Sequence, residues 1–309
     1  MSELDLIRWL QQRLGKSYGP LIHVGLGDDA AVLRCPDDRD FVITTDMILE
    51  GSCFLIEHGL RRIGRKALAI NLSDLAAMAA EPVAAVVSLA IPRSMSLSQV
   101  QEIYEGMIQL AQEFGVALVG GDTNTWTGPL AVNVTLVGAI ERHRAVLRQG
   151  AQPGDWLFVT GPLGGSILGK HLNFTPRVRE ARRLLNLVTI HAMIDISDGL
   201  ARDLHHLCEA SRCGAILDST KIPVSAAAYQ LQDGRSPLEH ALSDGEDFEL
   251  LLAVAQPDGQ HLLEQQPLQD LGTTLYHIGE CIAQGVYIRT ATGELQGLPP
   301  LGYLHQLAN

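Results

Sequence analysis

Six short segments of the sequence share one feature, an aspartate beside glycine or a small residue, at the predicted end of a strand or start of a helix. They are GDDAAV at 27–32, TTDMILEG at 44–51, NLSDLAAM at 71–78, GGDT at 120–123, DISDGL at 195–200 and SDGEDFEL at 243–250. Any one of them suits a helix cap or a turn, where an aspartate accepts hydrogen bonds from backbone N–H groups. Almost none of these acids has a basic residue within its own segment. Together they predict carboxylates that require cations from outside the chain.

The chemistry of these side chains favours magnesium. Asp74 is predicted to project from the same helix face as Asn71, beside an apolar stretch in which an uncompensated carboxylate is costly. Oxygen ligands without histidine or cysteine suit Mg²⁺ better than zinc. Because Mg²⁺ takes one or two carboxylates together with substrate phosphates, several aspartates indicate several ions around a polyphosphate. The sequence therefore predicts a site for a nucleoside triphosphate.

Three other kinds of site are disfavoured by their motifs. GSILGKH at 165–171 nearly matches a P-loop, but His171 stands where a hydroxyl should bind Mg²⁺. The histidines show no HExxH or other zinc spacing. Ser197 lies in DISDG and not in a GxSxG turn, so a nucleophilic serine is disfavoured. Phosphoryl transfer requires no covalent nucleophile.

Composition narrows the partners and the compartment. The chain has 309 residues, a formal charge of −12 and 5% aromatic residues, without a run of Lys and Arg, which argues against nucleic acid. Its five cysteines include no CxxC pair, so we expect reduced thiols in a cytoplasmic protein. The first residues, MSELDLIRWLQQRL, indicate an amphipathic helix and not a signal peptide. The longest apolar stretch, 83–91, is too short to span a bilayer, so no membrane association is expected.

The first half of the sequence predicts strands and helices that place the acidic segments. FVITTD at 41–46 reads as a strand, 62–80 as a helix, and VAAVVSLAI at 83–91 as a strand covered on both faces. A helix is predicted from a cap at Ser96 or Ser98 to Phe114, closed by Gly115. A short strand VALVG, a loop GDTNTWTGP and a long strand LAVNVTLVGAI follow.

The second half repeats this kind of organisation after a run of turn residues, RQGAQPG at 148–154. The strand WLFVT leads to a glycine-rich turn and to a helical region, DISDGLARDLHHLCEASRCG. Further strands are predicted near AILD, FELLLAV, TLYHIGE and VYIRT. We therefore expect an α/β or α+β protein with mixed sheets and flanking helices, divided into domains at 1–148 and 149–309.

The order and spacing of the motifs resemble those of the thiamine-monophosphate kinase family, over nearly the whole chain. The resemblance rests on the acidic segments above, on RKALAINLSDLAAM, RQGAQPGD and MIDISDGLARDL, and on a terminal GY. It implies membership of the aminoimidazole ribonucleotide synthetase superfamily, with a two-domain fold, a homodimer, and ATP bound through aspartate-held Mg²⁺ without a P-loop. The implied reaction is transfer of the ATP γ-phosphoryl group to thiamine monophosphate, giving thiamine diphosphate and ADP.

The resemblance also implies roles for individual residues. The residues that would hold or border Mg²⁺ are Asp29, Thr44, Thr45, Asp46, Asp74, Asp122, Asp195 and Asp198. Those that would contact ATP are Gly121, Asp122, Arg148 and Ser197. Those at the substrate positions are Cys53, Glu246 and Tyr303. Asp46, Asp122 and Asp198 are the expected catalytic residues.

The sequence departs from the family pattern on the acceptor side. Cys53 stands where the family usually has a histidine, and HLNFTPR at 171–177 has Asn173 in place of an arginine and Phe174 in place of a proline. The region before His171 is also shortened. A second interpretation is therefore a superfamily member with an altered acceptor pocket, which acts on another small phosphate or binds a nucleotide without catalysis.

Overall fold

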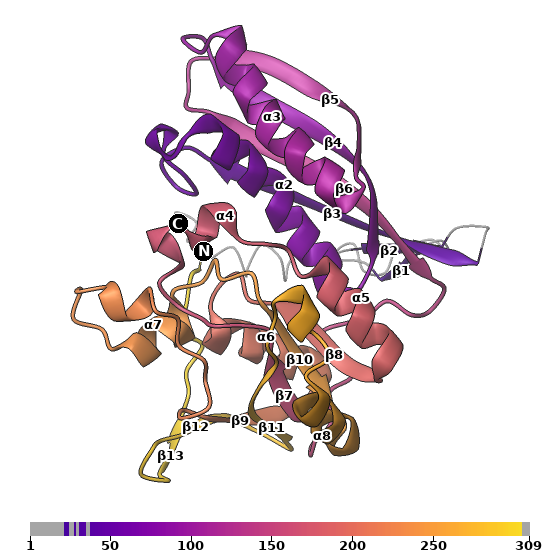
Figure 1. Ribbon diagram of the computed structural model, residues 1–309, viewed down its shortest axis with the longest axis vertical. Coiled ribbons are helices and arrows are strands. Elements are labelled where there is room, and N and C mark those ends of the chain that lie inside the picture. Colours follow the sequence, from indigo (N-terminus) through magenta and orange to yellow (C-terminus); the bar gives the residue numbers. More distant parts are fainter. Residues whose placement is uncertain (1–21, 25–27, 29–30, 35–37, 305–309) are drawn as a thin grey trace.

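The computed structural model describes residues 22–24, 28, 31–34 and 38–304 (Figure 1). The helix predicted over the first fourteen residues and the expected metal ligand Asp29 lie outside these residues. Within them, no helix combines the length and the apolar character needed to cross a membrane.

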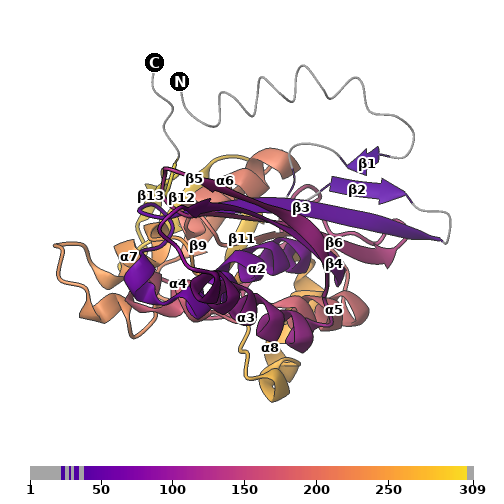
Figure 2. The ribbon, with the colours of Figure 1, turned by 90° about the horizontal axis from the view of Figure 1, so that it is seen from above.

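The N-terminal half is built on a six-stranded sheet in the order β1-β2-β3-β6-β4-β5. Its strands are β1 Ile22–Val24, β2 Ala31–Arg34, β3 Arg39–Leu49, β4 Glu81–Pro92, β5 Ala117–Trp126 and β6 Ala131–Glu141. Its helices are η1 Ile56–His58, α2 Leu60–Ala77 and α3 Leu97–Phe114. Figure 2 shows that α2 and α3 cover the same face of the sheet.

Helix α3 confirms its predicted ends. The Ser96 hydroxyl accepts a hydrogen bond from the backbone N–H of Gln99, and the Gln99 side chain accepts one from the Ser96 N–H, so the first turn is capped from both sides. Gly115 closes the helix in the left-handed conformation, at φ 70°.

Two strand predictions were wrong. Within the part of a single chain that the structure describes, β4 is covered on one face only, because its residues alternate between buried and exposed, and Val83 and Val86 face outward. GDTNTW is not a loop but the second half of β5, which pairs in parallel with β4 at the edge of the sheet. An apolar run alone does not reveal whether a second layer covers the strand, since valine and alanine also suit an exposed sheet face.

The C-terminal half contains a seven-stranded sheet in the order β13-β12-β9-β11-β7-β10-β8. Its strands are β7 Trp156–Val159, β8 Ile190–Asp195, β9 Gly214–Asp218, β10 Leu250–Val254, β11 Tyr276–Ile282, β12 Val286–Arg289 and β13 Leu295–Gly297. Its α-helices are α4 Lys170–Asn173, α5 Val178–Leu187, α6 Leu200–Ser211, α7 Pro237–Ser243 and α8 Gln256–Gln265. Short 3₁₀ turns lie at η2 Ser166–Leu168, η3 Ala228–Gln230 and η4 Gln269–Leu271. Strand and helix do not alternate strictly, so both sheets are mixed, as expected.

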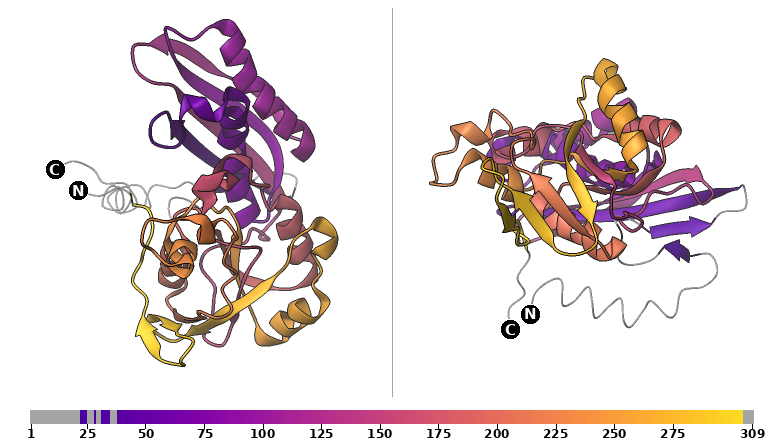
Figure 3. Two further views of the ribbon diagram at one scale, coloured as in Figure 1. Left: turned by 60° about the vertical axis from the view of Figure 1, so that its left-hand side comes forward. Right: turned by 90° about the horizontal axis from the view of Figure 1, so that it is seen from below.

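The two halves are stacked along the long axis of the molecule, with α2 and α4 near the junction (Figure 1), and the views in Figure 3 show the same stacking. One apolar cluster spans this junction, since it joins Leu68 and Leu72 of α2 to Leu184 of α5 and Phe248 near β10. A second cluster lies entirely within the C-terminal half, under α6. Helix α2 is buried along most of its length because elements of both halves pack against it. The division at residue 148 stays a prediction.

Candidate active site

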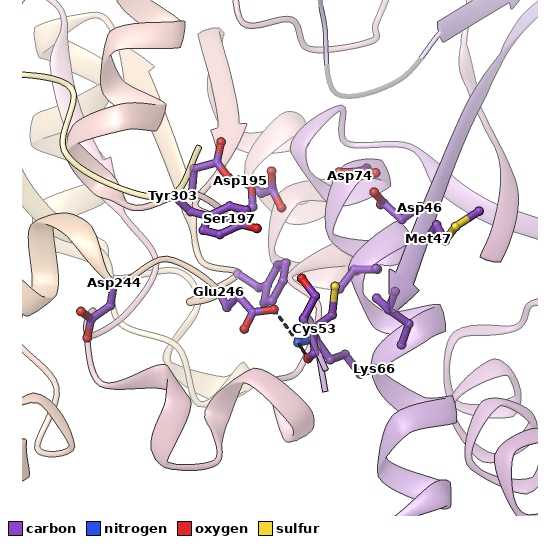
Figure 4. Close-up of a pocket in the computed structure, with 15 residues that line it drawn as sticks. Asp46, Met47, Cys53, Lys66, Asp74, Asp195, Ser197, Asp244, Glu246 and Tyr303 are labelled. Carbon is purple, nitrogen blue, oxygen red and sulfur yellow. Dashed lines mark hydrogen bonds and ion pairs between the residues drawn. The ribbon is translucent and has the colours of Figure 1, made fainter. Parts of the chain in front are cut away.

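A cavity of about 410 Å³ lies between the two halves, bordered by β3, α2 and three loops of the C-terminal half (Figure 4). Its polar lining consists of Asp46, Ser52, Cys53, Lys66, Asp74, Asp195, Ser197, Asp198, Asp244, Glu246 and Tyr303. Segments as far apart in the sequence as Asp46 and Tyr303 therefore meet at one place. We call it the acidic cavity.

Asp46 and Asp74 reach the cavity from the N-terminal half. Asp46 lies on β3 opposite Val134 of β6, and Val134 is buried on the face that the helices cover. Asp74 lies on the last turns of α2, and its carboxylate accepts a hydrogen bond from the hydroxyl of Thr44 on β3. The strand and the helix therefore fix the positions of the two carboxylates.

Asp195 and Asp198 come from the DISDG segment, where β8 ends and α6 begins. The Ser73 hydroxyl of α2 donates a 2.6 Å hydrogen bond to the Asp195 carboxylate, which ties the two halves together. The buried carboxylate of Asp203 accepts from the backbone N–H groups of Asp198 and Gly199, both at 3.1 Å. Burial, together with the charges of Asp198 and Asp195, raises the pKa of Asp203 well above its usual value. Asp203 thus holds the loop that carries Asp198.

Two further loops are pinned to DISDG by backbone hydrogen bonds. The N–H of Glu246 donates to the Ser197 carbonyl at 2.7 Å, and the N–H of Tyr303 donates to the Asp198 carbonyl at 2.9 Å. Gly245 has φ 73°, and a Cβ there would lie 2.7 Å from the Ser197 carbonyl oxygen, so the SDGED turn requires glycine. These contacts bring the predicted acceptor residues Glu246 and Tyr303 beside the predicted metal ligands.

Lys66 is the one basic residue in the lining, as far as the described residues go. Its side chain is 1% exposed, and its ammonium pairs with Glu246 and donates to the Cys53 carbonyl at 2.8 Å (Figure 4). Lys66 therefore joins α2 to the loop that carries Cys53 and to the SDGED turn. Lys66 is not among the residues predicted from the sequence, although the segment RKALAINLSD contains it, because the shared pattern of the acidic segments includes no cation.

The structure does not bring all predicted residues to the cavity. Asp122 of β5 lies opposite Ser88 of β4, and Ser88 lies opposite Asn133 of β6. Asn133 in turn lies opposite Met47 of β3, so Asp122 is on the sheet face of Met47 and not on that of Asp46. Thr45 lies on that outer face too, and its hydroxyl contacts Thr135 at 2.8 Å. The predicted residues outside the lining are Thr44, Thr45, Gly121, Asp122 and Arg148.

Arg148 lies at the junction of the two halves. Its backbone N–H donates to the Asp28 carboxylate at 3.2 Å, and its carbonyl accepts from Ser211 at the end of α6. Its positive charge lowers the pKa of Asp203, against the stronger effect of burial. Arg148 is therefore within electrostatic range of the DISDG loop without lining the cavity.

The glycine-rich turn that resembles a P-loop binds side chains of this protein. The N–H of Gly164 donates to Asp247 at 2.9 Å, and the N–H of Gly165 donates to Asp244 at 2.8 Å. Lys170, at the position of the P-loop lysine, pairs with Glu249 at 2.9 Å. The donors that a P-loop would offer to phosphate are thus occupied by carboxylates.

The donor set of the acidic cavity fits magnesium. Its five aspartates are hard oxygen ligands. One turn before Asp74 on α2, the buried Oδ1 of Asn71 has no hydrogen-bond partner among the residues that the structure describes. Among the described residues, the one group of three acidic or histidine ligand atoms lying within 4.8 Å of one another is Asp198, Asp203 and His206. The five aspartates of the lining are therefore spread around the cavity, an arrangement that suits several ions along a polyphosphate better than one caged ion.

Comparison with known proteins identifies the relatives of this chain. Residues 27–140 match the N-terminal domain, and residues 152–291 the C-terminal domain, of the family described as AIR synthase related protein. The thiamine-monophosphate kinase of Rhodopirellula baltica is 44% identical over 297 residues, covering 93% of this chain and 92% of the relative. That of Escherichia coli K12 is 34% identical over 256 residues, covering 76% and 77%.

Solved structures agree with these sequence matches. The structure described as AaThiL complexed with AMPPCP and TMP has a TM-score of 0.83 and 28% identity, covering 98% of this chain and 97% of that one. The hydrogenase maturation protein HypE of E. coli has a TM-score of 0.72 at 21% identity, covering 97% and 99%. The second likeness concerns the fold alone.

Proposed function

This chain belongs to the thiamine-monophosphate kinases within the AIR synthase related family, and on that premise we propose that it transfers the ATP γ-phosphoryl group to thiamine monophosphate. The products are thiamine diphosphate and ADP. The observation that carries the proposal is the convergence of five aspartates from four segments on one cavity, whose described lining holds a single lysine. Two anionic reactants can meet there only if added cations neutralise them. The altered acceptor pocket considered from Cys53 and Asn173 is not favoured at 44% identity over 297 residues.

We assign the metal-binding role to the acidic side of the cavity. Asp46, Asp74, Asp195 and Asp198 would hold Mg²⁺, and Asp29, Thr44 and Thr45 would border it. Mg²⁺ supplies charge neutralisation for the transferring phosphoryl group. The chain itself contributes fixed positions, because Thr44 orients Asp74, Ser73 orients Asp195, and Asp203 orients Asp198.

We place ATP along the aspartates, with Ser197 in the lining and Arg148 within electrostatic range of the DISDG loop. Gly121 and Asp122 complete the proposed nucleotide contacts from β5. Gly121 lies so close to β4 that a Cβ would stand 1.8 Å from the Val87 carbonyl oxygen, so β5 can approach β4 only with glycine there.

We place the acceptor at the opposite side of the cavity. Thiamine carries a cationic ring and an aminopyrimidine, which suit the carboxylate of Glu246 and the aromatic faces of Phe248 and Tyr303. The ammonium of Lys66 pairs with the Glu246 carboxylate and so fixes its orientation. Tyr303 is 49% exposed, so it lies at the rim, where it can cover a bound substrate.

A homodimer is also proposed, through the uncovered face of the six-stranded sheet. Phe41, Met47, Leu49 and Val86 are each at least 38% exposed on this face. Such an apolar surface on a sheet favours burial against a second copy. Sedimentation of the purified chain should give twice its 33.4 kDa mass, and a monomer with full activity would contradict the proposal. The free thiols at Cys53, Cys208, Cys213 and Cys281 support the proposed cytoplasmic location.

An assay of both products tests the proposed function. The purified chain is incubated with Mg-ATP and thiamine monophosphate, and thiamine diphosphate and ADP are quantified together. Equal amounts of the two products are expected. ATP binding without thiamine diphosphate would reject the acceptor while leaving the nucleotide site in place. Omission of Mg²⁺ should stop the reaction, and restored turnover on its return tests the metal proposal.

A further inference from the structure

A second cavity, of about 260 Å³, lies between α2 and α3 near α4. It is lined by Arg61, Arg62, Arg65, Gly106, Gln109, Leu110, Glu113 and Asn173. None of these residues lines the acidic cavity. We call this second cavity the arginine pocket.

The three arginines lack acidic partners at bonding distance. No hydrogen bond or ion pair joins the guanidinium of Arg61 or Arg65 to any residue that the structure describes. The one hydrogen-bond partner of the Arg62 guanidinium in the described part of the chain is neutral, the amide oxygen of Asn173, which accepts from Nε at 3.3 Å and from Nη2 at 2.8 Å. Glu113 is the one acid in the lining. Three positive charges thus meet one negative charge, in a chain whose formal net charge is −12.

Arg65 differs from an ordinary surface arginine. Its Nη1 is buried and has no hydrogen-bond partner among the described residues. Burial lowers the pKa of Arg65, and the charge of Glu113 opposes that effect only in part. A buried donor on a charged group is costly unless an acceptor meets it. A bound anion or an ordered water can supply the acceptor that this donor needs.

The arginines lie beside the point where α2 and α3 cross at close distance. A Cβ on Gly64 would lie 1.9 Å from the Ile103 carbonyl oxygen, and one on Gly106 would lie 1.9 Å from the Arg61 carbonyl oxygen. The two backbones therefore touch at these glycines. Arg61 and Arg65 are one helical turn apart and project from the same face of α2 beside this crossing. Their positions are set before a ligand arrives, which lowers the cost of binding.

We propose that the arginine pocket is a binding site for a small phosphate-bearing anion, separate from the cavity that takes the substrates. A guanidinium offers a planar pair of donors that matches phosphate oxygens, and the pocket provides three of them. A volume of about 260 Å³ suits a phosphate or diphosphate group and not a whole nucleotide. The anion can be free, or it can be the terminal group of a larger molecule whose remainder extends into solvent.

Calorimetric titration of the full chain tests this site, with the acidic cavity first saturated with Mg²⁺ and AMPPCP. The probes are inorganic phosphate, diphosphate and glycerol phosphate, with chloride as the control anion. We expect saturable binding of at least one phosphate probe and none of chloride. Tighter binding of inorganic phosphate or diphosphate indicates a free anion, and tighter binding of glycerol phosphate indicates the end of a larger molecule.

The variant Arg65→Met should weaken this binding by about tenfold or more, through loss of charged hydrogen bonds. Arg93→Met is the matched control, because it removes one charge from an exposed arginine just after β4 and should leave the affinity unchanged. If Arg65→Met melts at a markedly lower temperature, Arg61→Met, on the exposed side of the pocket, replaces it in the same titration.

The proposal is overturned if no phosphate probe binds saturably, or if the folded arginine variant binds as tightly as Arg93→Met. It is also overturned if Asp198→Asn abolishes the binding, since the anion would then occupy the acidic cavity. Failure of the kinase assay leaves this result unaffected, because the titration does not depend on turnover.

Discussion

Helix α2 borders two cavities of opposite charge. Toward the C-terminal half, Lys66 and Asp74 face the acidic cavity, where carboxylates outnumber a single lysine. Toward α3, Arg61, Arg62 and Arg65 face a pocket with a single glutamate. Each cavity leaves one sign of charge uncompensated by the described chain. A charge removed from water requires a partner of opposite charge. The same rule therefore predicts cations at the acidic cavity and an anion at the arginine pocket.

The largest effect is expected from the aspartates that are proposed to hold the metal ions and ATP. Asp46→Asn keeps the shape of the side chain but removes a negative charge, and Asp122→Asn does the same on β5. Both should lower kcat by about a hundredfold to a thousandfold, the range seen when one group that stabilises transition-state charge is lost. ADP release in steady state measures the effect.

Asp38→Asn is the control for both variants, because its side chain is 90% exposed far from the cavity. Full activity of Asp46→Asn would contradict the metal assignment. Full activity of Asp122→Asn alone would confine the site to the face of the sheet that carries Asp46 and exclude β5 from the nucleotide site.

Disruption of the helix crossing should break the arginine pocket and spare the acidic cavity. Gly106→Ala places a methyl group 1.9 Å from the Arg61 carbonyl oxygen. The helices must separate, so the free energy of unfolding should fall by about 3 kcal/mol, at the upper end for overpacking. Denaturant unfolding measures it. Gly297→Ala, where nothing lies within 4 Å, should change stability by less than about 0.5 kcal/mol. Equal stability of both variants would show that the crossing is loose.

A buried acid next to the SDGED turn should make the free energy of unfolding depend on pH. Asp247, the residue after Glu246, is fully buried, and burial raises its pKa to about 7. The charge of Lys170 and the hydrogen bond from the Gly164 N–H lower this pKa, but by less. Its pKa in the folded chain therefore exceeds that in the unfolded chain, near 3.8. The stability that this group contributes is complete below about pH 4 and is lost as the pH rises through 7.

Asp247→Asn cannot ionise, so it should gain stability over the wild type between pH 4 and 8, by about 2 kcal/mol at pH 8. Urea unfolding at several pH values measures the difference. A difference that stays constant with pH would mean that Asp247 is ionised at all of these pH values.

The smallest effect is expected at the single cation of the acidic cavity. Lys66→Met keeps the apolar stem but releases Glu246, so KM for thiamine monophosphate should rise by about tenfold, or about 1.4 kcal/mol. KM for ATP should stay unchanged. Stability should change little, because the Glu246 side chain is 37% exposed and water can replace the lysine. Lys221→Met, at an exposed lysine, is the control, and equal rises in both KM values would place Lys66 on the nucleotide side.

Much of the local structure of this molecule could be predicted from its sequence. The Ser96 cap, the Gly115 stop and the strands around β6 and β10 follow from residues that are neighbours in the chain. The acidic segments identified the chemistry for the same reason, since the absence of local basic partners can be read directly. The covering of β4 on one face could not be read in this way, because it depends on where other elements pack.

The sequence by itself determined which side chains are available and that the carboxylates need cations. Only the tertiary structure decided which of them meet. It brought Asp46, Asp74, Asp195 and Asp198 to one cavity, and it placed Asp122 on the opposite face of the sheet. It also paired Lys66 with Glu246 across 180 positions, and it left Arg61 and Arg65 without an ion pair among the described residues. The physical reason is that charge compensation depends on distance in space, and strand register and helix packing set that distance.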